Sequence, residues 1–301
     1  MDRNLTCQDP ANSPLSGVRI LSLALNLPGP AALLRCRTMG ADCMKLEPPS
    51  GDPMEVYCPA AYADLHVGIA TETADLKSDS GRARLHELLA QADVFLTSFR
   101  PSAIERLGLG WDLLTERYPK LSHVAIVGDH GAKAEDPGHD LTYLAEHGLV
   151  CGLALPASLF ADMSGALIAS ERVLSQVMLA RSAAGGSSRG AYSEVALGGA
   201  AQWLALPRTW GLTLPDGSVG GAHAGYRVYR CSDGRVALAA LEPHFARRLC
   251  EVVNLPPSDM LSPSVREALT GWFGQRNCAQ VRALATMNDL PLLVLPDRGV
   301  E

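Results

Sequence analysis

The sequence predicts an α/β protein in which a Rossmann-like parallel sheet forms a large domain and a smaller α+β domain follows it. Short apolar runs alternate with helix-like stretches over residues 18–127, which is typical of a parallel sheet covered by helices. A stretch rich in glycine and proline at 205–225 then separates this pattern from a hairpin and three further helix signals. The chain has 301 residues, of which 47% are hydrophobic, so both domains can bury a core.

Four apolar runs rich in branched side chains are the predicted strands of the large domain, at 18–25, 43–46, 94–99 and 123–127. Helical patterns are predicted at 31–39, 80–91, 113–118 and 158–181. Ligands of open parallel sheets bind beyond the carboxyl ends of the strands. Arg100 and Gly128 each follow one of these runs, so we expect them near a binding crevice.

The small domain is predicted to open with a β-hairpin, because two alternating runs flank the turn signal Ser232-Asp233-Gly234. The runs lie at 226–231 and 236–241; helices are predicted at 244–253, 264–273 and 278–286, and a last strand at 292–295. We therefore divide the chain into four parts. They are a large α/β domain at 14–204, a linker at 205–225, a small domain at 226–290 and a final segment at 291–301.

Composition and charge exclude several classes of protein. The net charge of −6 argues against a general binder of nucleic acid or of a membrane surface. It does not exclude a local basic pocket for an anionic ligand. The eight cysteines are scattered without a C-x-x-C pair, and the chain opens without a signal peptide, so we expect reduced thiols and a cytoplasmic location. The common motifs for dinucleotides, nucleotide phosphates and zinc proteases do not occur.

One histidine and three carboxylates are the candidate catalytic residues. His139 and Asp140 stand side by side where a glycine turn meets a predicted helix, and Asp162 and Glu242 lie in the mostly apolar stretches FADMSG and ALEPHF. An unpaired ionised group is costly in such surroundings, so these residues suit proton transfer or covalent attack on an acyl group. Each of them also fits a helix start, which is the structural alternative.

Several ordered segments resemble the family III CoA-transferases, the CaiB/BaiF type. The resemblance rests on PLSGVRI at 14–20, MGADCMKLEPPSGDP at 39–53, ADLKSDSGR at 74–82 and ADVFLTSFRPSAIERLGLG at 92–110, and it runs from about residue 14 to residue 295. It implies that the large domain binds CoA, that the family fold is an interlocked homodimer, and that 291–301 is a truncated form of a segment that returns to the large domain.

Two branches of this superfamily would use the residues differently. The α-methylacyl-CoA racemase branch is the more similar, because Gly138-His139-Asp140, Asp162 and Glu242-Pro243 occur in its order. By that resemblance His139 with Glu242 would serve one face of the α-carbon and Asp162 the other, while Asp140 supports the site. In the transferase branch an aspartate forms an acyl anhydride and then a CoA thioester, and the position that the resemblance assigns to it is Asp140.

The resemblance also implies the ligands. The substrate would be an acyl-CoA, with coenzyme A as part of the substrate and no tightly bound cofactor or metal. Arg100 and Arg106 match the arginines of the family's Arg-Pro motif, and Lys45 is a further candidate for the CoA phosphates. The expected activity is thus racemisation of a 2-methylacyl-CoA. The alternatives are CoA transfer between carboxylic acids through Asp140, and an inactive CoA-binding relative, because the basic run that usually precedes Asp75-Leu76-Lys77 is missing.

Overall fold

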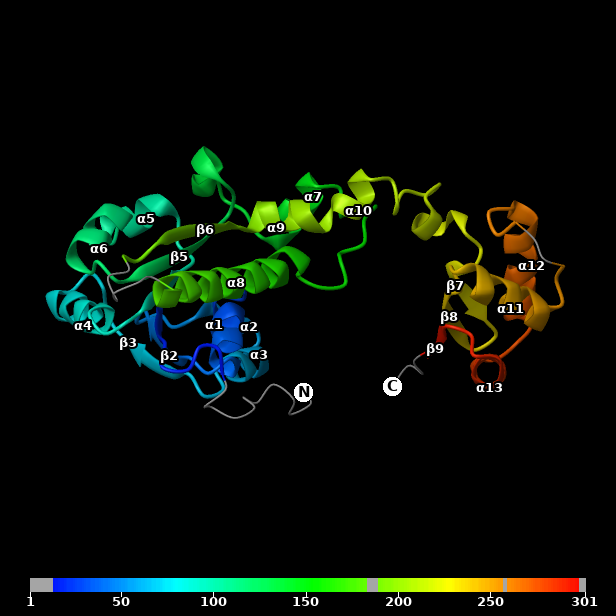
Figure 1. Cartoon of the computed structure of the whole chain (residues 1–301), viewed down its shortest axis with the longest axis horizontal. Helices are drawn as coiled ribbons and strands as arrows, with labels where there is room; N and C mark the ends of the chain where they lie inside the picture. Colours follow the sequence, from blue (N-terminus) through cyan, green and yellow to red (C-terminus); the bar gives the residue numbers. More distant parts are fainter. Residues whose placement is uncertain (1–12, 183–188, 257–258, 298–301) are drawn as a thin grey trace. The chain divides into compact units, whose positions relative to one another are not determined.

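A six-stranded parallel sheet forms the centre of the first unit of the computed structural model, which describes residues 13–182, 189–256 and 259–297 (Figure 1). Its strands are β1 (Arg19–Ser22), β2 (Asp42–Glu47), β3 (Ala70–Thr73), β4 (Val94–Thr97), β5 (Ser122–Val127) and β6 (Tyr192–Ala196). Their order across the sheet is β3-β2-β1-β4-β5-β6, which is the doubly wound arrangement that the sequence predicts.

The central strands are buried on both faces, and this explains why the sequence reveals them. Every residue of β4 and of β5 is buried. In β1, Ile20 belongs to one apolar cluster and Leu21 to another, because successive side chains of a strand point to opposite faces. The edge strands β3 and β6 were not predicted, since β3 is largely exposed and β6 carries exposed and half-buried residues at its start.

Two groups of helices cover the two faces of the sheet. On one face α1 (Pro28–Thr38) packs against the long helix α8 (Phe160–Ser182), which also contacts α7 (Asp140–Glu146) and α9 (Leu197–Leu204). The other face is covered by α4 (Asp79–Leu89), α5 (Pro101–Arg106) and α6 (Trp111–Arg117). Three short helices complete the unit, α2 (Pro53–Tyr57), α3 (Pro59–Leu65) and η3 (Gly131–Glu135).

The small residues of α8 allow close packing. A Cβ atom added at Gly165 would lie 2.3 Å from the side chain of Leu197 at the start of α9. Ala166, Ala169 and Val173 of the same helix are buried in the core that α1 shares. The predicted helix at 158–181 is therefore confirmed, and its glycine- and alanine-rich composition reflects contact with neighbouring helices.

The second unit begins at Leu206 and has its own apolar core. Its antiparallel sheet has the order β7-β8-β9, with β7 (Tyr226–Cys231), β8 (Gly234–Ala239) and β9 (Leu292–Pro296). The helices are α11 (Pro243–Val253), α12 (Pro263–Gly274) and α13 (Cys278–Asn288). The hairpin is confirmed, because Cys231 pairs with Gly234 across the predicted turn.

The observed boundaries differ from the predicted ones in two places. The stretch at 205–225 contains α10 (Leu206–Thr209) and η5 (Ser218–Ala222) and clusters with the second unit, so it is more structured than a linker. The final segment was expected to be separate from the small domain, but β9 pairs along β8 and completes the small sheet. Residues 298–301 lie outside the described part. Within the described ranges, no helix is both long and apolar enough to cross a membrane.

Acid stability is expected to depend on the buried His123 of β5. Its Nε2 lies 2.9 Å from Thr97 Oγ1, and burial lowers the pKa of the imidazole to about 3. A histidine with a lowered pKa in the folded state stabilises the fold above about pH 6.5, and this contribution is lost as the pH falls from there towards 3. Each pH unit in this window is expected to cost about 1.4 kcal/mol of unfolding free energy.

The measurement is urea unfolding of the wild type and of His123→Phe between pH 7 and pH 4. The variant leaves Thr97 without its partner, so only the pH dependence is compared. The wild type should lose more stability on acidification than the variant. Equal losses in the two proteins would contradict the account.

Candidate active site

A cavity of about 190 Å³ lies beyond the carboxyl ends of β1, β4 and β5. Leu25 and Asn26 line it from the loop after β1, Phe99 and Arg100 from the segment after β4, and Gly128 from the end of β5. Strands β1 and β4 are neighbours, while the chain runs from β1 to β2 on one side and from β4 to β5 on the other. The cavity therefore lies at the switch point of the sheet, and the prediction that Arg100 and Gly128 approach a crevice is confirmed.

Asp162 lies in the first turn of α8 and lines this cavity. Its side chain is half-buried. Burial, together with the smaller effect of the neighbouring charge of Asp140, raises the pKa of its carboxyl to about 6. A carboxyl group with a pKa near 6 can both accept and donate a proton at neutral pH.

Asp140 has a different position from the one that a nucleophile requires. It is the first residue of α7, only 4% of it is exposed, and it does not line the cavity. Its Oδ1 accepts a hydrogen bond of 3.0 Å from the backbone N–H of Asp162. Asp140 thus fixes the start of α8, and this observation supports a positioning role for it.

His139 is the N-cap residue of α7, is exposed, and lines the same cavity as Asp162. Its backbone N–H donates to Thr142 Oγ1 at 3.0 Å, and the N–H of Thr142 donates to the carbonyl oxygen of His139 at 2.9 Å. These hydrogen bonds involve the main chain of His139 and not its imidazole, so the imidazole is available to a ligand in the cavity. The structure therefore brings His139 and Asp162 to one site, from the starts of two different helices.

Tyr143 also lines the cavity, and it was not among the candidate residues selected from the sequence. Burial raises the pKa of its hydroxyl, and Asp162 and Asp129 add to that shift. A Cβ atom at Gly128 would lie 2.7 Å from Tyr143 Oη, and one at Gly138 would lie 2.6 Å from the same oxygen. A side chain at either glycine would therefore displace the phenol from its present position.

Glu242 belongs to the second unit. It is the N-cap residue of α11, is exposed, and is followed by Pro243 in the first turn. This matches the alternative in which Glu242 begins a helix. Because the two units are described separately, its association with His139 stays a prediction.

The two arginines lie at opposite ends of α5, Arg100 as its N-cap residue and Arg106 as its last residue. Both are exposed, Arg100 lines the cavity, and Arg106 Nη1 has a long contact of 3.5 Å with Ser102 Oγ. Glu135 of η3 lies nearby, with its carboxylate accepting from Ser102 N at 2.7 Å and from Ser102 Oγ at 2.8 Å. These hydrogen bonds lower the pKa of Glu135, and the charges of both arginines lower it further. The guanidinium groups remain accessible to an anionic ligand.

Lys45 lies inside the fold, because its side chain is 0% exposed. The Nζ atom lies 2.9 Å from Glu47 Oε1, 2.9 Å from His66 Nε2 and 2.5 Å from Asp52 Oδ2. The ammonium group has three partners in a closed environment, so its geometry does not support the predicted contact with a CoA phosphate. A lysine at the end of a strand is usually exposed, and its burial here depends on partners from α2 and from the end of α3.

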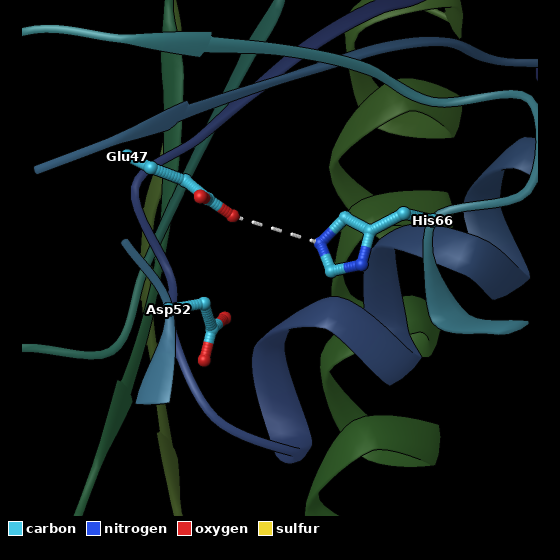
Figure 2. A group of neighbouring side chains, drawn as sticks. All are labelled: Glu47, Asp52 and His66. Carbon is cyan, nitrogen blue, oxygen red and sulfur yellow. Dashed lines mark ion pairs between the residues drawn. The ribbon is translucent and has the colours of Figure 1, made fainter. Parts of the chain in front are cut away.

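The side chains of Glu47, Asp52 and His66 turn toward one another (Figure 2), and one ligand atom of each lies within 4.8 Å of the others. Such a set could hold a metal ion, but the ammonium group of Lys45 already supplies the positive charge. His66 Nδ1 lies 2.6 Å from the carbonyl oxygen of Tyr62, which leaves Nε2 to accept from Lys45. Burial lowers the pKa of His66, which keeps it neutral beside that ammonium. The ammonium group of Lys45 therefore takes the place that a metal ion would have among these three side chains.

A second cavity, of about 470 Å³, lies at the ends of β1 and β2. Its wall is mostly apolar and includes Leu23, Leu46 and Pro48, and the exposed Lys77 is among its polar residues. Phe99 lines both this cavity and the first one, so the two are adjacent.

Comparisons with known proteins identify relatives over most of the chain. The family model described as CoA-transferase family III matches residues 15–296. The probable fatty acyl-CoA transferase Rv3272 of Mycobacterium tuberculosis is 28% identical over 277 residues, covering 81% of this chain and 69% of the relative. The α-methylacyl-CoA racemase of Homo sapiens is 26% identical over 263 residues, covering 82% of this chain and 66% of the racemase.

A higher identity occurs over a shorter stretch. The cinnamoyl-CoA:phenyllactate CoA-transferase of Clostridium sporogenes is 37% identical over 151 residues, which are 46% of this chain and 36% of that enzyme. The aligned parts thus span between 36% and 69% of the length of these three relatives. Among solved structures, that of Rv3272 superposes with a TM-score of 0.81 at 22% identity, covering 95% of this chain and 85% of that one.

Proposed function

This chain belongs to the family III CoA-transferases, and we propose that it racemises a 2-methylacyl-CoA by proton transfer between two bases. The observation that supports this proposal is the shared cavity of His139 and Asp162 at the switch point of the sheet. A racemase removes the α-proton from one face of a thioester and returns a proton to the other. An imidazole and a carboxyl with a pKa of about 6 are suited to both tasks near neutral pH.

The surroundings of the cavity support a CoA thioester as the substrate. In this proposal the acyl group occupies the smaller cavity and the CoA moiety extends past Phe99 into the larger apolar one. The exposed guanidinium groups of Arg100 and Arg106 and the ammonium group of Lys77 then serve the CoA phosphates. Glu242 is proposed to stabilise the charged form of His139.

CoA transfer between carboxylic acids is the second candidate, and one observation changes its expected nucleophile. Asp162 lines the cavity, whereas Asp140 is buried and bonded to the main chain of Asp162. An acyl anhydride needs a carboxylate that can approach the acyl carbon. If transfer occurs, we propose that it proceeds through Asp162, with Asp140 as its positioning residue.

A single experiment separates these reactions. The protein is incubated in D₂O with a 2-methylacyl-CoA, with and without an added carboxylic acid, and both α-deuteration and transfer of CoA to the acid are followed by mass spectrometry. Racemisation predicts α-deuteration without the acid. Transfer of CoA to the acid without α-deuteration supports the second candidate, and neither product, despite binding of CoA, supports the inactive relative.

The rate of exchange is expected to depend on pH through Asp162. The pKa of its carboxyl is raised to about 6, so the basic carboxylate form prevails above that pH. Proton abstraction by Asp162 should therefore increase as the pH passes through about 6 and then level off. The measurement is the initial rate of α-deuteration between pH 4.5 and pH 8. A rate that is constant over this range would contradict the assignment.

A further inference from the structure

Asn26 lies in the short loop between β1 and α1 and lines the same cavity as His139 and Asp162. Its φ is +64°, in the left-handed region that residues other than glycine seldom adopt and that asparagine tolerates best. The carboxyl end of β1 therefore brings an amide side chain to the acyl site in a conformation that the rest of the structure must hold.

The main chain of Asn26 is held by the buried cluster around Lys45. Asp52 Oδ1 accepts from the N–H of Asn26 at 3.0 Å and from the N–H of Met54 at 2.9 Å, while Asp52 Oδ2 pairs with Lys45 Nζ. Both charged side chains are 0% exposed. Lys45 thus holds the carboxylate of Asp52, and Asp52 in turn holds the loop that carries Asn26. The buried cluster therefore contributes to the geometry of the cavity.

The side chain of Asn26 is oriented by Tyr57 of α2. The hydroxyl of Tyr57 donates to Asn26 Oδ1 at 2.6 Å, which engages the amide oxygen and leaves the two N–H donors of Nδ2. Across residues 13–182, 189–256 and 259–297, no protein group accepts a hydrogen bond from that Nδ2. An oriented donor without a protein acceptor, in the wall of a cavity, is suited to polarise a carbonyl group.

We propose that Asn26 Nδ2 donates a hydrogen bond to the thioester carbonyl oxygen of the bound acyl-CoA, and that Lys45 and Asp52 are its positioning residues. The inference rests on the proposed function in so far as both place the acyl group in this cavity. When the α-proton passes to Asp162 or His139, the electrons of the C–H bond move into the enolate and its negative charge collects on that oxygen. Asn26 stabilises this charge.

Loss of one such donor lowers kcat by about 10²–10³-fold in enzymes that stabilise an oxyanion. Asn26→Gly removes the amide, while glycine retains the left-handed backbone. Tyr57→Phe removes only the hydroxyl that orients the amide, at a side chain that is exposed and does not contribute to the core. We expect a full effect in the first variant and a smaller one in the second.

The test is the infrared carbonyl band of a 2-methylpropanoyl-CoA labelled with ¹³C at the thioester carbon. Binding to the wild type should move the band to lower wavenumber, and Asn26→Gly should return it toward the value of the free thioester. Asn254→Gly is the matched control, because Asn254 also has a left-handed backbone, with φ of +58°, and does not line the cavity. Its band should match the wild type.

Two results would overturn the inference, namely a bound band with the same position in the wild type and in Asn26→Gly, or no shift on saturation of the wild type. The exchange assay on the same samples separates this from failure of the proposed function. α-Deuteration without any Asn26-dependent shift removes the inference alone. An Asn26-dependent shift without α-deuteration supports the hydrogen bond and removes the racemase proposal alone.

Discussion

Replacing Asp162 with Asn is expected to lower kcat for α-proton exchange by about 10²–10⁴-fold from the enantiomer whose α-proton Asp162 removes, because the substitution removes a general base and acid. The variant should fold normally. The raised pKa shows that the ionised carboxyl is disfavoured in the folded state, so at pH 7 the neutral amide should leave stability unchanged or increase it by about 1–3 kcal/mol. The measurements are the initial rate of α-deuteration and the midpoint of urea unfolding.

Asp140→Asn is the matched control, because it is the same chemical change at the adjacent carboxylate. The oxygen of the new amide can still accept from the backbone N–H of Asp162, so the start of α8 should be preserved. Since the charge of Asp140 raises the pKa of Asp162, its removal should move the acid limb of the rate profile to lower pH. A loss of activity in Asp140→Asn as large as that in Asp162→Asn would contradict the assigned roles.

Replacing Lys45 with Met is expected to destabilise the protein by about 3–5 kcal/mol, because a buried carboxylate loses its counter-ion. Asp52 is buried with 0% exposure of its side chain and Glu47 with 5%. Neither can recover its hydration without local unfolding, which would also release the loop that Asp52 holds at Asn26. The measurement is the free energy of unfolding in urea at pH 7.

Lys133→Met provides the comparison at the surface. Lys133 Nζ lies 2.7 Å from Glu146 Oε1, but its side chain is 59% exposed, so the loss of stability is expected to be much smaller than that in Lys45→Met. Double replacement of Lys45 with Met and Asp52 with Asn should recover part of the stability, because one unpaired charge is removed. If Lys45→Met is as stable as Lys133→Met, the buried lysine does not hold the cluster together.

The sequence predicts those strands in which every consecutive residue is buried, because they appear as uninterrupted apolar runs. Strands β4 and β5 are buried throughout, and their uninterrupted apolar runs predict them. The edge strand β3 has the sequence ATET and is mostly exposed, so no apolar run marks it. The short helices α2 and α3 each begin at a proline and bury little, and they too were missed.

The sequence identifies site residues whose type and neighbours already indicate a function. It does not reveal roles that depend on contacts with residues far away in the chain. His139 and Asp162 were selected for their surroundings, and they line one cavity. The bond between Asp140 and the main chain of Asp162 joins residues 22 positions apart, and no local pattern reveals it. Asn26 precedes Leu27 and a Pro-Gly-Pro stretch, a turn signal that could have drawn attention to its left-handed backbone.

The cytoplasmic location, which was inferred from the cysteines and the start of the chain, stays a prediction. Other interpretations of the sequence depend on the resemblance and also stay predictions. The pairing of Glu242 with His139, the homodimer and the contacts of Arg100 and Arg106 with CoA phosphates belong to this group. They involve a second unit, a second chain or a ligand. The geometry of one unit at a time does not test them.

The central claim is that His139 and Asp162 act on opposite faces of one α-carbon, and exchange from each enantiomer measured separately tests it most directly. Single-turnover α-deuteration of the (R)- and (S)-2-methylacyl-CoA is followed for the wild type, His139→Ala and Asp162→Asn. We predict that each variant loses exchange from one enantiomer and that the two variants lose opposite ones. Loss of both enantiomers in Asp162→Asn, with His139→Ala unaffected, would contradict the two-base account.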